Sequence, residues 1–503
     1  MLNQMLNRTV SSYPQRDAIV CGETRITYHE LGNQVLNCAR GLNNLGVGET
    51  DCVALILPNC PEFIISFYAV SRLQGISLLL NPACKQQELA HYIEDSQAKV
   101  IITDKARAAV CQRLIEASDR QINLVVVGEL VTRGVPFSSL LKEPLAHIQT
   151  ATASEQNVIY QYTSGSTGQP KQVCRTQANL FYQARNCVAT MEITQNDNIF
   201  CSIPLYHAYG LGECLLAATY SGAKLVILES CSPPEAATET ALIFRRHRIL
   251  QLIEQEAITI LPSVPYLYSI LASTPVDRNV DLSRLRLCIS AGNFLAKDVF
   301  DRFLLRFGVP IQQLYGCTEA GSVAVNLSAT SQERYNSVGL PMKNVHIAII
   351  GNDETEVLPG IEGEIAIESQ TLAPQYNTTS GERYYLTSDI GYKDRDGYIF
   401  ITGRQKVFIN AGGHKVDPLE IESVLSEHPA IKEVVVVGKS ISQTVLEGEV
   451  VKAVIVIDGT CSETDIKSYC QDKLADFKIP RIFEFRTEIP KTSLGKIMRH
   501  TLV

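Results

Sequence analysis

The fold of this chain can be read outward from one stretch, Asn157-Val158-Ile159-Tyr160-Gln161-Tyr162-Thr163-Ser164-Gly165-Ser166-Thr167-Gly168-Gln169-Pro170-Lys171. Residues 157–162 alternate in the manner of a β-strand, and the residues after them are small, hydroxylated or glycine. Glycine allows close approach of the backbone to a ligand, while hydroxyls, N–H groups and a lysine can surround phosphate oxygens. The stretch therefore predicts a nucleotide phosphate loop at the end of a strand. The predicted phosphate-binding residues of this loop are Thr163, Ser164, Gly165, Ser166, Thr167, Gly168 and Lys171.

Two observations limit what can be inferred about nucleotide binding from this loop alone. The Walker pattern GxxxxGK[ST] does not occur in the chain, so the loop is not of the commonest nucleotide-binding type. A flexible Ser/Gly/Thr loop without any ligand would have the same composition. The remaining motifs of the chain have to decide between these two interpretations.

Length and composition place the chain among globular proteins of several domains. It has 503 residues, of which 45% are hydrophobic and 19% charged, and two to four domains are expected. The net charge of −8 argues against non-specific binding to nucleic acid. The N-terminus lacks an apolar signal core and no apolar run approaches a membrane span, so we expect a cytoplasmic protein with no membrane partner. The fifteen cysteines are scattered without CxxC pairs, which favours reduced thiols over disulfides or zinc ligands.

Hydrophobic periodicity predicts an α/β protein. Short apolar runs alternate with helical patterns from about residue 17 to residue 370, which favours parallel sheets covered by helices. Residues 336–402 contain short strands separated by turn residues, so a small β-rich, barrel-like unit is expected there. A polar break at 403–406 precedes a small α+β region. The predicted organisation is an N-terminal portion of two α/β subdomains and the β unit (1–402), a hinge (403–406) and a C-terminal domain (407–503).

Further motifs accompany the phosphate loop. Pro204-Leu205-Tyr206-His207-Ala208-Tyr209-Gly210 places a histidine between aromatic residues, although such a histidine is often only packed in a core. Leu314-Tyr315-Gly316-Cys317-Thr318-Glu319 combines a flat ring for a base, a hydroxyl, and a carboxylate that suits magnesium. A strand–helix junction with capping residues would look the same.

The last two motifs lie near the C-terminal end. Tyr385-Leu386-Thr387-Ser388-Asp389 is followed by Gly403-Arg404, and a carboxylate with a nearby arginine suits a ribose diol, although a turn aspartate is the alternative. Pro490-Lys491-Thr492-Ser493-Leu494-Gly495-Lys496 predicts an exposed loop that presents Lys496, which taken alone could be an inert surface lysine.

In this order, the motifs resemble those of the acyl-adenylate-forming (AMP-binding) superfamily. That superfamily contains acyl- and aryl-CoA ligases, adenylation enzymes of non-ribosomal peptide synthesis, and beetle luciferases. The resemblance covers nearly the whole chain and implies a large N-terminal portion hinged to a mobile C-terminal domain. It further implies the following roles: Tyr315 for adenine, Asp389 and Arg404 for ribose, Glu319 for Mg²⁺ with Thr318 beside it, His207 near the substrate carboxylate, Lys406 as the hinge, and Lys496 as the adenylation lysine.

The resemblance also implies a two-step reaction with ATP, Mg²⁺ and a phosphopantetheine thiol. A carboxylate attacks the α-phosphorus of ATP and pyrophosphate leaves, so cations must be directed at the transition state. The acyl-adenylate then acylates a thiol that enters past the loop 410–415. The glycines of this predicted pantetheine channel, Gly412 and Gly413, let the thiol arm pass close to the backbone.

The resemblance also implies that the acid lies in a pocket formed by the His207 segment, residues 289–292 and the tyrosine motif. The predicted pocket residues are Tyr209, Gly210, Glu213, Val264, Ile289, Ala291, Leu314, Ser322 and Val323. Leu314 stands where many fatty-acyl enzymes carry glycine, which favours a small acid. Glu213 could receive a substrate ammonium, or it could be a surface or salt-bridged glutamate. The aspartate of amino-acid-activating relatives is missing near Tyr209, which argues against an α-amino acid.

From these features we expect activation of a small amino or imino acid, proline-sized, and its loading onto a separate carrier protein. A CoA ligase for a short or aromatic acid is the alternative. A luciferase-like oxygenase shares the same motifs. A non-catalytic nucleotide-binding protein would be expected to lack Lys496 or Glu319, and both are present.

Overall fold

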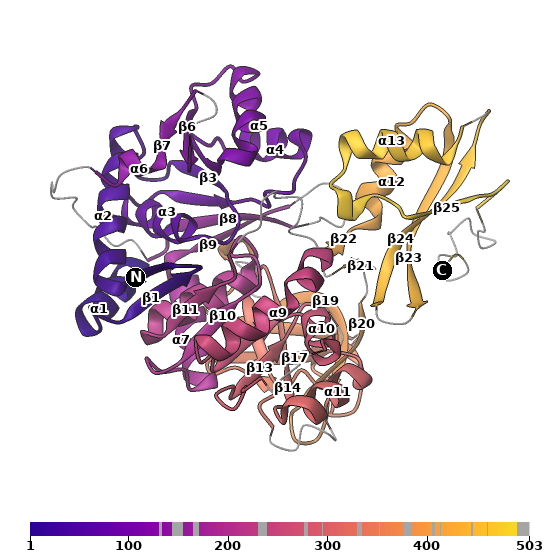
Figure 1. Cartoon of the computed structure of the whole chain (residues 1–503). Coiled ribbons are helices and arrows are strands. Elements are labelled where there is room, and N and C mark those ends of the chain that lie inside the picture. The colour runs from indigo at the N-terminus through magenta and orange to yellow at the C-terminus, as the bar shows by residue number, and fades with distance from the viewer. Residues whose placement is uncertain are drawn as a thin grey trace. The chain divides into compact units, whose positions relative to one another are not determined.

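The structure is a computed structural model of the whole chain (Figure 1). It describes residues 1–129, 133–142, 154–163, 171–229, 239–275, 280–293, 295–328, 334–351, 353–376, 384–404, 408–412, 414–443, 446–459, 461–489 and 502, with the backbone alone at 239–241, 404, 441–443 and 446–448. Among these residues, no helix combines the length and the apolar content that crossing a membrane would require.

The first sheet contains seven strands of the described chain, in the order β7-β6-β5-β3-β4-β8-β9. The pairings from β7 to β8 are all parallel, as expected from the alternation of strands and helices. The strands are β3 (Cys52–Ile56), β4 (Ile76–Leu79), β5 (Val100–Asp104), β6 (Asn123–Val127), β7 (Val135–Pro136), β8 (Asn157–Thr163) and β9 (Lys171–Thr176). The helices between them are α3 (Pro61–Arg72), α4 (Gln86–Asp95), α5 (Lys105–Glu116) and α6 (Phe137–Leu140).

A second sheet contains nine described strands in the order β16-β15-β14-β13-β12-β10-β11-β1-β2. Its centre is parallel, and its edges β2, β15 and β16 are antiparallel. The strands are β1 (Asp17–Cys21), β2 (Thr24–Thr27), β10 (Asn198–Cys201), β11 (Lys224–Ile227), β12 (Ile260–Ser263), β13 (Leu287–Ser290), β14 (Ile311–Cys317), β15 (Gly321–Val325) and β16 (Leu340–Pro341). The helices of this part are α1 (Leu2–Ser12), α2 (Tyr28–Asn44), α7 (Gln177–Met191), the π-helix η1 (Gly210–Leu216), α8 (Ala217–Ser221), α9 (Glu239–Gln255), α10 (Pro265–Ser273) and α11 (Lys297–Phe307).

Alternation along these strands fills a core on each face of the second sheet. Ile260 and Ile289 belong to the core that includes α1, α2, α3 and α7, whereas their neighbours Leu261 and Cys288 belong to the core beneath α9, α10 and α11. Successive side chains of a strand point to opposite faces, so a strand covered on both sides reads as a continuous apolar run. The predicted buried strands are confirmed for this reason, and their helices can be followed in Figure 1.

Four described strands form a smaller sheet in the order β17-β18-β19-β20. They are β17 (Val345–Ile350), β18 (Gly363–Ser369), β19 (Tyr385–Lys393) and β20 (Ile399–Arg404), and the 3₁₀ turn η3 (Pro374–Tyr376) lies between the second and third. A turn follows β19, where the N–H of Asp394 donates to the carbonyl of Tyr398, in keeping with the expected short strands separated by turn residues. Together with the two large sheets, this half-barrel confirms the predicted fold class.

The C-terminal sheet has, among the described residues, the order β22-β21-β24-β23, with β25 paired to β24. Its strands are β21 (Ile409–Ala411), β22 (His414–Val416), β23 (Ile431–Gln443), β24 (Leu446–Ile457) and β25 (Ile482–Phe485). The helices are α12 (Pro418–Ser426), α13 (Glu463–Lys473) and η4 (Asp476–Lys478). Helix α13 begins with a capping box, in which Ser462 and Asp465 satisfy each other's backbone N–H groups.

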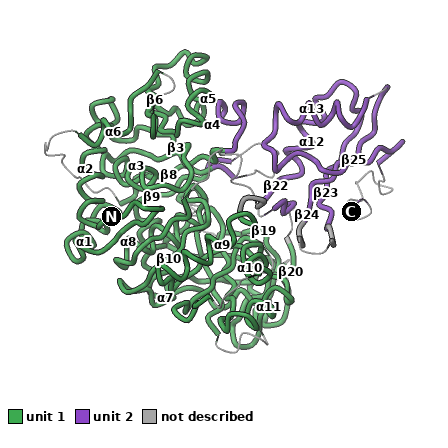
Figure 2. The backbone as a smooth tube through the Cα atoms, in the orientation of Figure 1, with its two compact units in different colours: residues 1–82, 93–161, 173–403 green, residues 83–92, 162–172, 404–503 purple. Residues whose placement is uncertain are grey.

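The chain divides into two compact units (Figure 2). The first comprises residues 1–82, 93–161 and 173–403, and the second comprises 83–92, 162–172 and 404–503. The sequence pattern gave no indication that residues 83–92 and 162–172 belong with the C-terminal region. Within the second unit, the buried ammonium of Lys478 forms ion pairs with Glu88 at 2.8 Å and Glu420 at 2.7 Å. The boundaries proposed from sequence, with a hinge at 403–406, stay a prediction.

Candidate active site

The tyrosine and aspartate motifs meet in the first unit. The hydroxyl of Tyr315, near the end of β14, donates to Oδ2 of Asp389 on β19 at 2.5 Å. Both side chains are 7% exposed. Burial, followed by the Asp389 charge, raises the pKa of Tyr315 well above its usual range, so this hydroxyl remains a donor. The structure thus brings the predicted adenine and ribose residues together, and it fixes the ring of Tyr315 through the carboxylate.

The predicted magnesium ligand lies in the turn between β14 and β15. Thr318 and Glu319 are half-buried, and the carbonyl of Glu319 accepts the N–H of Ala373 at 2.8 Å. The charge of Glu319 also contributes, after burial, to a raised pKa of Tyr385. Mg²⁺ is commonly held by one or two carboxylates together with substrate phosphates, so the half-buried Glu319 carboxylate fits the ion.

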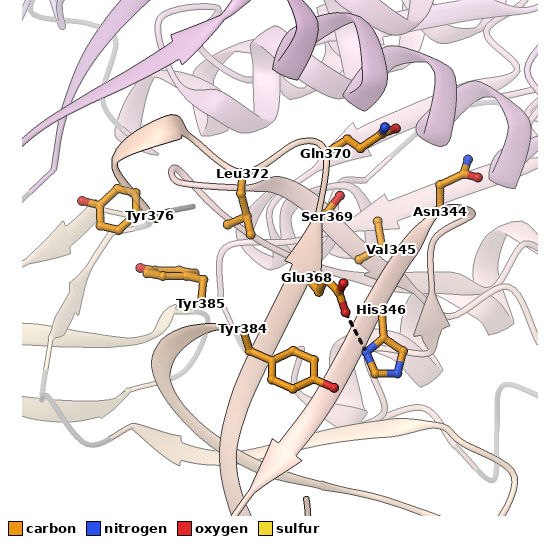
Figure 3. Close-up of a pocket in the computed structure, with 10 residues that line it drawn as sticks. All are labelled: Asn344, Val345, His346, Glu368, Ser369, Gln370, Leu372, Tyr376, Tyr384 and Tyr385. Carbon is orange, nitrogen blue, oxygen red and sulfur yellow. Dashed lines mark ion pairs between the residues drawn. The ribbon is translucent and has the colours of Figure 1, made fainter. Parts of the chain in front are cut away.

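A pocket of about 710 Å³ adjoins this turn through Tyr376 and Tyr385 (Figure 3). Tyr376 and Tyr385 pack with their ring centres 4.9 Å apart. His346 and Glu368 line the same pocket, where Nδ1 of His346 lies 3.9 Å from Oε2 of Glu368. Figure 3 shows that these side chains come from the half-barrel strands and from the segment before β19. None of the pocket's lining residues was predicted from sequence.

The histidine motif leads directly into the π-helix η1. His207 is exposed, and its Nδ1 accepts the N–H of Tyr209 at 3.2 Å. Gly210 is required here because a Cβ at this position would stand 2.2 Å from the carbonyl oxygen of Pro204. The hydroxyl of Tyr209 contacts the carbonyls of Ser263 at 3.3 Å and Ile289 at 2.9 Å. Tyr209 therefore joins the start of η1 to the ends of β12 and β13.

Several of the predicted acid-pocket residues are buried in the same part of the first unit. Several share one apolar cluster, namely Tyr209, Ile289, Ala291, Leu314 and Val323. Val264 follows β12 and lies 3.9 Å from the Cβ position of Gly292, next to Ala291. The pairing of β14 with β15 sets Ser322 opposite Gly316, so Ser322 lies one strand away from the tyrosine motif. That these residues line an acid pocket stays a prediction.

Glu213 is the most unusual residue of this group. It lies in η1, is 1% exposed, and neither of its carboxylate oxygens has a hydrogen-bond partner among the described residues. Burial raises its pKa to about 7, and the nearby Ser322 hydroxyl, Gln183 amide and Arg175 charge offset part of this rise. The alternative of a surface glutamate is therefore wrong, and Glu213 forms no ion pair among the described residues.

Several predicted residues lie outside the described residues or are described only in part. Those outside are Ser164, Gly165, Ser166, Thr167, Gly168, Lys406, Gly413 and Lys496. The side chain of Arg404 is likewise not described, although its backbone ends β20. In the second unit, Thr163 ends β8, the exposed Lys171 begins β9, and Gly412 has a positive φ of 60° that favours glycine. Their roles stay predictions.

Two buried polar side chains near Glu213 were not predicted from the sequence. Arg175 is fully buried at the end of β9, and Gln183 is 1% exposed on α7. The available signal for a buried polar cluster was an arginine within a strand-like segment. Arginine is almost never fully buried without partners, so its burial in a strand implies polar groups nearby. The partners themselves come from helices and loops that no local pattern connects.

Comparison with known proteins agrees with this geometry. The AMP-binding enzyme family matches residues 6–377, and the family of AMP-binding enzyme C-terminal domains matches residues 420–496. The chain belongs to the AMP-binding enzyme family. It is an enzyme of the adenylate-forming, acid–thiol ligase type, and the resemblance inferred from the motifs is confirmed.

Relatives and solved structures extend over almost the entire chain. An oxalate–CoA ligase of Arabidopsis thaliana is 30% identical over 99% of this chain and 97% of its own length. A long-chain-fatty-acid–CoA ligase of Bacillus subtilis is 28% identical over 100% of this chain and 94% of its own. An amide bond synthetase from Marinactinospora thermotolerans has the same fold, with a TM-score of 0.86 at 23% identity over 99% of this chain and 98% of that chain.

Proposed function

We propose that this AMP-binding enzyme activates a small acid carrying a basic nitrogen, such as proline, and transfers the acyl group to a phosphopantetheine thiol of a separate carrier protein. The observation that carries the nitrogen is Glu213, a fully buried carboxylate that forms no ion pair among the described residues. An unpaired buried charge is costly, and a substrate ammonium would compensate it. Leu314, buried at 5% exposure, supports a short acid because it occupies volume beside the tyrosine motif.

In the first step, the substrate carboxylate attacks the α-phosphorus of ATP and the bond to pyrophosphate breaks. Tyr315 presents its ring to the base, and Asp389, held by the Tyr315 hydroxyl, accepts hydrogen bonds from the ribose. Lys496 bridges the substrate carboxylate and the α-phosphate oxygens, which lowers the repulsion between two anions. Glu319 would hold Mg²⁺, whose positive charge stabilises the leaving pyrophosphate.

In the second step, the thiol releases its proton to solvent, the sulfur attacks the acyl carbon, the bond to AMP breaks, and AMP leaves as the anion. Since the acyl-adenylate reacts readily with water, the site has to exclude water until the thiol arrives. The loop with Gly412 would let the pantetheine arm pass close to the backbone.

CoA is the second candidate for the acceptor. Curated relatives that match the full chain are named CoA ligases, including enzymes for oxalate and for long-chain fatty acids. This supports a CoA thioester of a short or aromatic acid as the product, with the same adenylation chemistry.

The test is acid-dependent exchange of labelled pyrophosphate into ATP over a panel containing proline, other small amino acids, benzoate, hexanoate and oxalate. The proposal expects exchange with proline that is lost in Glu213→Gln, while Glu116→Gln, an exposed control, retains it. Exchange with benzoate or hexanoate but not with any amino acid would refute the nitrogen-bearing substrate. Offering CoA or a phosphopantetheinylated carrier to the preferred acid then decides the acceptor.

A further inference from the structure

Two buried polar side chains lie near Glu213 in the first unit, Arg175 on strand β9 and Gln183 on helix α7. Arg175 on β9 donates from Nη1 to Oε1 of Gln183 at 2.7 Å and from Nη2 to the carbonyl of Thr371 at 3.1 Å. Burial lowers the pKa of Arg175 to about 10, so its guanidinium stays charged at neutral pH. The amide of Gln183 thus has a buried cation on its oxygen side.

The nitrogen side of the same amide faces the π-helix. Nε2 of Gln183 has no acceptor among the described residues, and it lies only 2.0 Å from where a Cβ on Gly212 would stand. Gly212 immediately precedes Glu213, whose carboxylate oxygens also lack partners within the described chain. The Gln183 amide lowers the pKa of Glu213 against the larger effect of burial, so the two groups are neighbours.

Two glycines make room for this arrangement. A Cβ on Gly212 would collide with Gln183, and a Cβ on Gly321 would stand 2.4 Å from its side-chain amide. Gly321 has a φ of +70° and begins β15, one strand residue before Ser322. The amide of Gln183 is therefore confined between η1 and the turn that carries Glu319, in one orientation that the Arg175 hydrogen bond selects.

We propose that Gln183 is a positioning residue that bridges the Arg175 cation to the Glu213 carboxylate. When Glu213 is ionised, the amide nitrogen donates to one of its oxygens, while the amide oxygen accepts from Arg175. This bridge favours the ionised form of Glu213 and leaves the other carboxylate oxygen for the substrate, where it selects acids with a basic nitrogen and rejects acids with a second carboxylate. The part concerning the substrate rests on the proposed function, whereas the bridge itself does not.

The first experiment needs no substrate. A double-mutant cycle combines Gln183→Met with Glu213→Gln and measures the melting temperature of the ligand-free enzyme at pH 8. Gln183→Met should lower the melting temperature more in the wild-type background than in the Glu213→Gln background, because only in the wild type does a carboxylate lose its donor. The two decreases should differ by about 2 °C or more. Melting temperatures that add within error would overturn the bridge.

The second experiment follows the acid that the wild-type enzyme exchanges best. Gln183→Met should raise the KM for that acid about tenfold and shift the midpoint of its pH profile upward, while kcat at saturation changes less than twofold. Gly212→Ala, which displaces the Gln183 amide, should raise the KM and shift the pH profile in the same way. Two control variants should leave both quantities unchanged: Gly48→Ala, whose Cβ has its nearest neighbour at 3.7 Å, and Asn186→Ser, which lies on α7 like Gln183. Equal losses of kcat in Gln183→Met and Asn186→Ser would indicate a merely structural role.

Failure of the two proposals can be told apart. If no nitrogen-bearing acid is exchanged but the cycle shows coupling, the substrate assignment is wrong and the bridge stands. If proline is exchanged and the cycle is additive, Glu213 acts without Gln183.

Discussion

The replacement of Glu213 by glutamine should make the protein more stable at alkaline pH and change its stability little at acidic pH. Glu213 is 1% exposed and burial raises its pKa from 4.5 to about 7. Below pH 4.5 the carboxyl is protonated in the folded and the unfolded chain. Between pH 4.5 and about 7 the unfolded chain releases the proton while the folded protein retains it, so stability falls as the pH rises and levels off above pH 7.

The size of this effect follows from the pKa difference. Because one pKa unit corresponds to about 1.4 kcal/mol, the ionised side chain costs about 3 kcal/mol above pH 7. Glutamine has no charge but brings an amide that also needs partners, so we expect a gain of about 1–3 kcal/mol at pH 8. For an α/β unit of this size, that gain corresponds to a rise in melting temperature of a few degrees.

The assay is the melting temperature of wild type and Glu213→Gln at pH 5, 6, 7 and 8, without ligand. The difference between the two proteins should grow from pH 5 to pH 8, whereas Glu116→Gln, an exposed glutamate on α5, should show no trend. A difference that stays constant over this range would refute the reasoning, because Glu213 would then not ionise within the folded protein at a raised pKa.

Three further changes test other parts of the molecule. Tyr315→Phe removes the 2.5 Å hydrogen bond to Asp389 and should raise the KM for ATP about tenfold or more in pyrophosphate exchange, and an unchanged KM would contradict a nucleotide role for this pair. Lys478→Met leaves Glu88 and Glu420 without their cation and should destabilise the protein by about 3 kcal/mol, measured by denaturant unfolding, with partial recovery in the double variant that adds Glu420→Gln. If that addition lowers stability further, the ion pairs are not the cause. Lys496→Ala should lose about a hundredfold or more in acyl-adenylate formation yet retain thioester formation from supplied acyl-adenylate, and equal loss of both would contradict separate roles for the two steps.

Local pattern predicted a large part of the fold because the signals involved are local. The alternation at residues 157–162 became β8, which leads to the glycine-rich loop. Helix α12 begins with Pro418 in its first turn, a position that suits proline because its fixed φ is already helical. Side-chain period, turn residues and caps act over a few neighbours, so they can be read without knowledge of the tertiary fold.

The residue pattern identified the site as separate motifs, and only the resemblance to a family implied that they serve one nucleotide. Sequence spacing cannot show that Tyr315 and Asp389, 74 residues apart, share a hydrogen bond. It also gave no reason to expect the cation of Arg175 in the core, or residues 83–92 and 162–172 within the second unit. These facts depend on which strands pair and which faces pack, and many chains with the same local pattern could differ in them.

The sequence by itself determined the α/β class, the family and the identity of the chemical groups, since residue types and their order along the chain are what it contains. The tertiary structure decided the environment of each group. Glu213 is the clearest case, because the same glutamate would have an ordinary pKa at the surface and has one of about 7 in η1. Desolvation and the distance to other charges set this difference, and both are properties of the folded protein.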